Sequence, residues 1–554
     1  MNVLRSMRTA VWISFLVFTW TGCADLVVEN DNSPDKSQVL ADPNDVVNLI
    51  GSSFLDFWRA NVWQNGQMPL TAIADEYSYS WANFAGRHLS SEPRVAFDNS
   101  PTFAYADAMK EPWDNNYLAI SNTSDALSII NQDESAFEEA AKLKAFARFI
   151  QGLCHGYIAL RYDQGFTVDE DSDLTTLELK PYPEVMEFAL QKLEESIAIA
   201  NSNPFTIPAE DDWIFGLTVT NEDLVRLAHS FMARFIASVG RRPAERASTN
   251  WALVIQHAEQ GITEDWAPVG NDSGELEWDP TKAWGQEGRS WSRADYRTIG
   301  PADKSGGFRN WLNQPVEDRS VFDIYTSDRR IVGPEDGMET IVAGEQRDRA
   351  GAHTAGTVLT YPQNSGTDFE YWGVPGPFPP SRGTYHYSSH THKRYRAYLD
   401  NGNNGPMVQF KVTELDMLIA EGLLRTGGST DRAAELINKT RVERGQLNPA
   451  SGSDAVGSPD DDQSPMDDAS LWAKLKHEKN IECYLAASGR AYFDKRGWGD
   501  LVPGSPLHFA VPGGELEVLQ IPIYTFGGPG GEDAASKAGR GAYRTSNIYI
   551  ERPK

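Results

Sequence analysis

The sequence has few cysteines and few basic residues, and both shortages exclude classes of protein. Only three of its 554 residues are cysteines, too few for a disulfide framework or a thiolate metal site. Lysine and arginine number 50 against 78 acidic residues, which gives a net charge of −28. Such a charge repels the phosphates of DNA and RNA. We therefore expect no nucleic acid among its partners.

The short motifs of common enzyme chemistries are also absent. The sequence contains no GxGxxG, GxxxxGK[ST], HExxH, GxSxG or CxxC segment, the patterns of dinucleotide, P-loop, zinc-protease, serine-hydrolase and thiol sites. We therefore predict no cofactor and no metal ion. A glycosidase remains an alternative, because its paired carboxyls follow no local pattern.

No apolar stretch near the N-terminus is long enough to span a bilayer, which takes about 20 residues. Arg5 and Arg8 precede a short apolar stretch over residues 10–20, which is followed by Cys23. This order is typical of a bacterial lipoprotein signal, and the alternative is an ordinary secretory signal with an incidental cysteine. We interpret residues 1–22 as the signal and Cys23 as the lipidated residue. Two or more acyl chains, such as palmitate, anchor a protein stably.

The remaining chain divides by composition. Residues 23–41 are polar and predict a flexible tether. Residues 42–265 predict a helical N-terminal part, and residues 266–554 a C-terminal part. Within the latter, residues 266–400 are rich in glycine, proline and aromatics and predict a loop-rich lobe, while residues 401–554 return to helical pairs and a tail.

Apolar residues at helical spacing predict long helices in the first and last parts. One helix begins at Pro43, and the others cover residues 113–130, 138–162, 183–200, 220–238, 413–425, 430–444 and 471–485. Thr220 with Asp223, and Thr413 with Asp416, have the spacing of capping boxes. The predicted fold class is all-α (mostly α), with tetratricopeptide-like helix pairs forming a right-handed superhelical scaffold beside an irregular, loop-rich ligand-binding lobe.

The cysteines and histidines each leave two alternatives open. Cys154 and Cys483 are either two separate buried thiols or one disulfide. His386, His390 and His392 have a spacing that would suit a metal ion on an extended strand. Tyrosine and basic neighbours favour a plain polar surface for this histidine cluster instead.

Aromatic residues are concentrated in the loop-rich lobe. Six of the sixteen tryptophans lie between residues 266 and 372. The face of a tryptophan or tyrosine ring can stack on the apolar face of a sugar, while asparagine, aspartate and arginine bind its hydroxyls. Core packing is the alternative for any single tryptophan. Their concentration in loops favours a binding surface.

Four segments, residues 113–122, 145–165, 414–444 and 478–498, carry a family resemblance. They resemble motifs of the SusD/RagB family of lipid-anchored nutrient-binding proteins. Residues 113–122 match its W-x-x-x-Y-x-x-I helix, and residues 145–165 its helix that ends in a tyrosine-glycine turn. Residues 414–444 match its E-x-x-L-x-x-A-E and I-N-x-x-R helices, and residues 478–498 its late arginine- and tryptophan-containing signature. Ser488 stands where the family often has glutamate, and the usual Asn-Pro-Gly-Tyr ending is missing.

The resemblance implies an outward-facing outer-membrane lipoprotein that binds oligosaccharides, or less readily peptides, and delivers them to a SusC-like TonB-dependent transporter. It implies no catalysis. The family binds ligand in the loop before the first tryptophan helix and in the middle lobe. In this chain those regions contain Trp81, Asn83, Arg87, Trp284, Trp291, Trp311, Tyr371 and Trp372.

Two other functions remain as alternatives. A lipid-anchored α/α-barrel polysaccharide lyase or glycosidase would also have many helices and cleft aromatics, although its helices would be evenly distributed along the chain. A helical scaffold for protein assembly would have no glycan ligand.

Overall fold

The computed structural model describes residues 42–79, 82–271, 278–287, 292–333, 340–343, 357–360, 366–371, 386–460 and 469–534. Val47–Lys554 forms one compact unit, and Met1–Val46 is assigned to another. Cys23, the predicted signal and the predicted tether lie outside the described residues. Within the described ranges, no helix combines the length and the apolar character that a membrane span requires.

Helices dominate the first half of the chain. They are α3 (Pro43–Asn61), α4 (Gln64–Ile73), α5 (Gly86–Leu89), α6 (Asp107–Gln132), α7 (Ala140–Arg161), α8 (Tyr182–Ser202), α9 (Asn221–Ser238), α10 (Pro243–Ala247) and α11 (Trp251–Glu259). Helices α7, α8 and α9 lie within two residues of their predicted bounds, whereas α6 begins six residues before its predicted start at Trp113. Helix α4 was not predicted. Its sequence contains Gly66 and Pro69, two residue types that disfavour helices, so the apolar spacing of a helix is not evident there.

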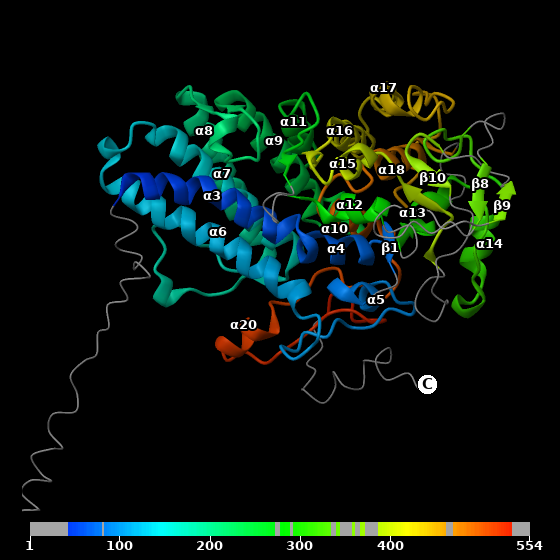
Figure 1. Cartoon of the computed structure of the whole chain (residues 1–554), viewed down its shortest axis with the longest axis horizontal. Coiled ribbons are helices and arrows are strands. Elements are labelled where there is room, and N and C mark those ends of the chain that lie inside the picture. The colour runs from blue at the N-terminus through cyan, green and yellow to red at the C-terminus, as the bar shows by residue number, and fades with distance from the viewer. Residues whose placement is uncertain are drawn as a thin grey trace, which may run out of the picture. The chain divides into compact units, whose positions relative to one another are not determined.

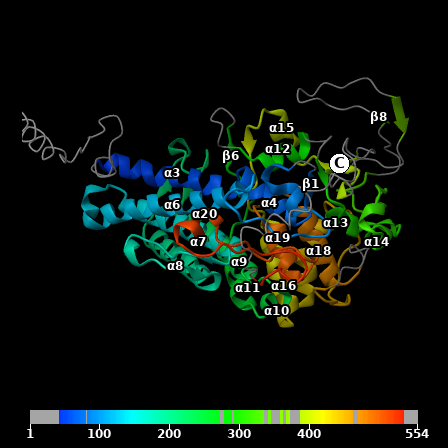
Figure 2. The same cartoon turned by 90° about the horizontal axis from the view of Figure 1, so that it is seen from below.

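Helix α7 is almost entirely buried and packs between α6 and α8, as Figure 2 shows. Two glycines permit the close approach of its neighbours. A Cβ atom on Gly152 would lie 2.6 Å from Leu193 Cγ of α8, and one on Gly156 would collide with the ring of Phe235 of α9. The absence of these two side chains therefore brings the three helices together.

Further helices follow in the second half. They are α12 (Pro280–Glu287), α13 (Tyr296–Ile299), α14 (Gly307–Asn313), α15 (Arg396–Asp400), α16 (Val412–Thr426), α17 (Thr430–Arg441), α18 (Leu471–Glu482), α19 (Arg490–Trp498) and α20 (Gly513–Val518). Helices α16 and α17 form the predicted hairpin. Gly427 ends α16 with φ of 66°, the left-handed conformation that glycine adopts without steric cost.

One of the two predicted capping boxes is confirmed and the other is wrong. Thr220 accepts a hydrogen bond from the backbone N–H of Asp223, and the Asp223 carboxylate accepts one from the backbone N–H of Thr220. Helix α16 instead begins one residue before Thr413. Asp416 is turned to α17, where it accepts a hydrogen bond from Lys439 Nζ at 2.7 Å.

Successive helices pack against one another in an array: α6 on α7, α7 on α8, α8 on α9, α9 on α11, α11 on α16, and α16 on both α17 and α18 (Figure 1). A buried ion pair ties distant members together, because Arg246 of α10 contacts Glu421 of α16 at 2.8 Å and Asp494 of α19 at 3.0 Å. The predicted mostly α fold with paired helices is confirmed.

The strands are short and pair only in twos among the described residues. The antiparallel pairs are β1 (Tyr77–Tyr79) with β7 (Ser292–Ala294), β2 (Gln164–Gly165) with β3 (Lys180–Pro181), β4 (Thr206–Ile207) with β5 (Val219–Thr220), β6 (Val269–Gly270) with β12 (Gly405–Pro406), β8 (Thr340–Ala343) with β9 (Thr357–Thr360), and β10 (Phe369–Tyr371) with β11 (His390–His392). Six of these twelve strands, β6 to β11, lie within residues 266–400, the predicted loop-rich lobe.

Cys154 and Cys483 are separate, buried free thiols. Burial raises the pKa of the Cys483 thiol to about 12, and it also raises that of the Cys154 thiol. Both groups therefore stay protonated at neutral pH. Of the two alternatives, the structure shows the unpaired one.

Candidate functional site

Three partly exposed aromatic side chains meet between two distant parts of the sequence, and we call them the aromatic platform: Phe84, Trp278 and Trp284. The rings of Phe84 and Trp284 stack with centroids 5.8 Å apart and an interplanar angle of 25°. Trp278 meets Trp284 edge-on at 5.3 Å. Exposed aromatic surface of this kind suits a ligand with an apolar face.

The backbone around Phe84 is strained. Phe84 and Ala85 adopt left-handed φ angles of 55° and 56°, which non-glycine residues rarely do. The next residue, Gly86, lies so close to β1 that a Cβ atom there would collide with the Tyr79 ring. The turn is thus pressed onto β1, with Asn83 exposed and Arg87 partly exposed beside Phe84.

The pairing of β1 with β7 brings the two regions of the platform together. Tyr77 lies opposite Ala294, and Tyr79 lies opposite Ser292. At the Tyr79 end, Ser292 Oγ donates a hydrogen bond to the carbonyl of Trp284 at 3.3 Å. This bond fixes the end of the strand pair to α12, the helix that carries Trp284.

Part of the predicted ligand-binding set converges here. Asn83, Arg87 and Trp284 lie in the two segments that meet at the platform, which joins the loop before α6 to the middle lobe. Their role in binding stays a prediction. Trp81, Trp291 and Trp372 lie outside the described residues.

Trp311 and Tyr371 are buried, each only 2% exposed, which differs from the expectation that loop aromatics face solvent. Trp311 packs on Tyr296 at 5.4 Å and under the guanidinium of Arg319 at 4.5 Å. Tyr371 Oη donates a hydrogen bond to Asp323 Oδ1 at 2.6 Å. Protein atoms already cover both rings, Trp311 in α14 and Tyr371 in β10.

Phe84 and Trp278 complete the platform without having been predicted as ligand residues. Trp278 belongs to the tryptophan-rich segment, so that enrichment was a usable signal. Phe84 had no comparable signal, because its placement depends on a left-handed backbone and on a strand more than 200 positions away.

The histidine cluster is buried, so the expected polar surface is wrong. His386, His390 and His392 are each at most 1% exposed. Burial lowers the pKa of His386 to about 4 and that of His390 to about 3. His390 and His392 lie in β11 and pack edge-on against Tyr371 and Phe369, so they serve as neutral core rings.

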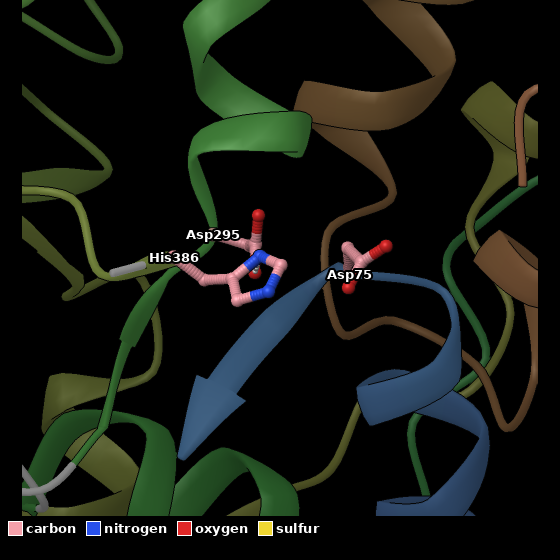
Figure 3. Close-up of side chains that lie close together, drawn as sticks. All are labelled: Asp75, Asp295 and His386. Atoms are coloured by element: carbon pink, nitrogen blue, oxygen red, sulfur yellow. Dashed lines mark ion pairs between the residues drawn. The ribbon is translucent and has the colours of Figure 1, made fainter. Parts of the chain in front are cut away.

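His386 instead approaches two aspartates, and we call this group the carboxyl cluster: Asp75, Asp295 and His386 (Figure 3). One ligand-type atom of each residue lies within 4.8 Å of the others. Asp75 lies two residues before β1, and Asp295 directly follows β7. The cluster is therefore at the Tyr77 end of the strand pair, opposite to the platform.

The charges around the carboxyl cluster do not suit a metal ion. Arg94 Nη2 contacts Asp75 Oδ2 at 2.6 Å, and Arg297 Nε lies 4.0 Å from the same oxygen. Lys495 Nζ lies 3.4 Å from the Asp75 carbonyl. A divalent cation would add charge to a buried site that already holds three cations. Burial, and then the charge of Asp75, raise the pKa of the Asp295 carboxyl.

Comparisons with known proteins identify the fold. No protein-family model and no curated protein matches the chain. A solved SusD-like carbohydrate-binding protein from Bacteroides fragilis aligns with a TM-score of 0.51 at 13% identity, over 83% of this chain and 87% of that one. A SusD superfamily protein from Bacteroides vulgatus aligns with a TM-score of 0.48 at 13% identity, over 83% and 89%. The alignment with the B. fragilis protein shows that the chain has the SusD-like fold that its sequence motifs predict.

Proposed function

We propose that this protein is a non-catalytic outer-membrane lipoprotein that binds oligosaccharides at the aromatic platform and delivers them to a SusC-like TonB-dependent transporter. The observation that carries the proposal is the platform itself, in which the partly exposed ring of Phe84, on a strained turn, stacks on the ring of Trp284, on α12. The SusD-like fold supports it, since the B. fragilis protein with this fold is described as carbohydrate-binding.

The chemistry of the platform fits a sugar. The aromatic rings offer apolar faces for the C–H face of a pyranose, and Asn83 and Arg87 add donors for its hydroxyls. Because the rings already contact one another, little side-chain entropy is lost when a ligand binds. A glycan is favoured over a peptide, because the site is built from ring faces that stack on flat apolar surfaces.

The two aspartates of the carboxyl cluster are not placed to act as the catalytic pair of a glycosidase. A hydrolytic pair of carboxyls must flank the glycosidic bond and reach it directly. Asp75 and Asp295 are at most 3% exposed, and they lie at the end of the strand pair away from the platform. Their burial excludes this pair as the catalytic carboxyls of the lyase or glycosidase alternative.

The cellular part of the proposal rests on the sequence. Cys23, as the lipidated residue, would hold the binding unit Val47–Lys554 at the membrane, and the helical array is our proposed contact surface for the transporter. The tether between them would leave the platform free to meet glycans outside the cell.

A glycan-array screen of the full-length chain with Cys23→Ala, followed by titration of the strongest ligand, tests the proposal. Trp284→Ala and Phe84→Ala should each weaken binding at least about tenfold, or about 1.4 kcal/mol, because each removes one ring of the stack. Tyr325→Ala is the matched control, since Tyr325 is an aromatic residue of the same lobe that is 52% exposed and lies outside the platform.

The control should bind like the parent. Unchanged affinity in both platform variants would refute the site, and cleavage of the glycan at an enzyme-like rate would refute the non-catalytic role.

A further inference from the structure

Helix α12, which carries Trp284, begins directly after Trp278 and Asp279 and packs on α4 and α15 (Figure 1). We propose that Asp279 is a positioning residue for the aromatic platform. It fixes the direction in which the chain enters α12, and it thereby holds the ring of Trp278 against that of Trp284. The effect on glycan binding rests on the proposed function, whereas the effect on the two rings does not.

Asp279 occupies the capping position of α12, directly before its first residue. Its Oδ1 accepts a hydrogen bond from the backbone N–H of Lys282 at 3.1 Å, which is the bond of a helix cap. Its backbone carbonyl accepts the first bond of the helix, from the N–H of Ala283 at 3.1 Å. Pro280 follows at the first helical position, where its fixed φ suits the start of a helix. Asp279 therefore determines where α12 begins.

The second carboxylate oxygen joins α12 to a segment 130 positions away. Oδ2 of Asp279 accepts a hydrogen bond from Gln409 Nε2 at 2.7 Å and forms an ion pair with Lys282 Nζ. All three side chains are buried. Solvent therefore cannot replace a partner that is removed, and each lost bond leaves a buried polar group unpaired.

Gln409 is itself fixed to the helical array. Its backbone carbonyl accepts a hydrogen bond from Arg234 Nη2 at 3.3 Å, and Arg234 of α9 forms a buried ion pair with Glu414 of α16 at 2.8 Å. The backbone N–H of Gln409 donates to the carbonyl of Trp266 at 2.9 Å. Through Asp279, the helix that carries the platform tryptophan is thus held by a partner that is anchored in the array.

Two more bonds hold the backbone just before α12. Trp58 Nε1 of α3 donates to the carbonyl of Trp278 at 3.2 Å, and the backbone N–H of Asp279 donates to Tyr398 Oη of α15 at 3.0 Å. Both aromatic partners are buried. The ring of Trp278 is partly exposed, so its place depends on the direction of this backbone.

The contact between the two tryptophans spans the start of the helix. Trp278 precedes the cap, Trp284 lies in the second turn of α12, and their rings meet edge-on at 5.3 Å. A contact of this kind is tied to the angle at which the chain enters the helix. Without the cap and the bond to Gln409, residue 278 would be free to turn away from α12. Within the platform, Trp284 would then keep only its stacking on Phe84.

Circular dichroism of the full-length chain with Cys23→Ala tests the ring pair. Two indole rings at this distance give an exciton couplet that depends on the angle between them, and the difference spectrum between the parent and Trp278→Phe isolates it. Asp279→Ala should lose this couplet. Its affinity for the strongest array glycan should fall about three- to tenfold, the cost of ordering one freed side chain on binding.

A second set of variants separates position from stability, because Asp279→Ala also removes a cap and leaves the Lys282 ammonium buried without its carboxylate. Asp279→Ser with Lys282→Met keeps a capping hydroxyl and removes both charges, so that the bond to Gln409 is lost without an unpaired charge. Gln409→Met removes the same bond from the other side. Each should weaken the couplet and the affinity. Combining them should cost no more than either alone, because both act through one bond.

Asn250→Ala is the matched control for a lost helix cap. Asn250 Oδ1 accepts a hydrogen bond from the N–H of Leu253 at 3.2 Å, at the start of α11, which packs on α9 and α16. This variant should lower the melting temperature and leave the couplet and the glycan affinity unchanged.

A couplet equal to that of the parent in Gln409→Met and in Asp279→Ser with Lys282→Met overturns the proposal, even if Asp279→Ala does not fold. So do additive losses in the combined variant, and so does a control that loses the couplet. Unchanged glycan affinity despite a lost couplet overturns the effect on binding. If no glycan binds, the proposed function fails, and the dichroism still decides this inference.

Discussion

At the scale of single residues, the platform depends on a backbone that side chains normally avoid. Left-handed angles at non-glycine residues cost on the order of 1–3 kcal/mol each, and Phe84 and Ala85 have them in succession. Two contacts hold the turn in place: Gly86 against the Tyr79 ring, and Phe84 against Trp284. The strain is therefore balanced by packing, and it presents the Phe84 ring to the platform before any ligand arrives.

Gly86→Ala tests this balance. The new methyl group would overlap the Tyr79 ring, so we expect the free energy of unfolding to fall by about 1–3 kcal/mol, the usual cost of overpacking, and glycan affinity to fall with it. Urea denaturation and ligand titration measure the two effects. Gly514→Ala in α20 is the control, because no atom lies within 4 Å of its Cβ position. Equal stability of the two variants would contradict the packing argument.

At the scale of secondary structure, helices with one continuous apolar face were predictable from the sequence. Helix α7 and helix α9, whose capping box is formed, agree closely with their predicted bounds. Helix α4 could not be predicted by spacing, because Pro69 and Gly66 are helix breakers that tertiary packing overrides. The Thr413–Asp416 box failed because Asp416 is engaged by Lys439 of the next helix, a partner that local spacing does not reveal.

The candidate site was predictable only by region. The loop before α6 and the middle lobe were both expected to contribute, and Trp284 was among the named residues. The strand pairing that joins them links residues more than 200 positions apart, a contact without a local pattern. The burial of Trp311 could not be predicted from the sequence either. The side chains that cover it, Tyr296 and Arg319, come from segments without a helical or strand pattern.

The two predicted capping boxes, one formed and one not, allow a matched pair of threonine variants. Thr220→Val removes the hydroxyl that caps α9, so it should cost about 1 kcal/mol, within the usual range for a lost cap. Thr413→Val removes the same hydroxyl inside α16, where it caps nothing, and should change stability by less than about 0.5 kcal/mol. Thermal unfolding measures both. Equal losses would mean that the capping bond at Thr220 contributes little.

At the scale of the whole molecule, buried ion pairs connect the irregular lobe to the helical array. Arg330, in the lobe, contacts Glu478 of α18 at 2.7 Å, and Asp328 accepts a hydrogen bond from His477 of the same helix at 2.7 Å. Breaking such a buried pair costs about 3–5 kcal/mol. The lobe, which has few long elements of its own, is therefore stabilised as part of the unit Val47–Lys554.

The proposed division between anchor and binding unit predicts the behaviour of Cys23→Ala. The variant should move from the membrane fraction to the soluble fraction, because one site of acylation holds the chain at the bilayer. Its affinity for the array glycan should equal that of the lipid-free wild-type chain, since the platform lies within Val47–Lys554. Fractionation and titration test this. Retention in the membrane, or loss of binding, would contradict the division.

The buried state of the two remaining cysteines has a practical consequence. Once Cys23 is replaced, Cys154 and Cys483 are the only thiols of the chain, and both are inaccessible and protonated at neutral pH. A maleimide dye would therefore react at one place only, at a cysteine introduced by Asn83→Cys on the exposed rim of the platform. The molecule is, without further engineering, a scaffold for a fluorescent reporter that responds when a sugar displaces water beside the dye.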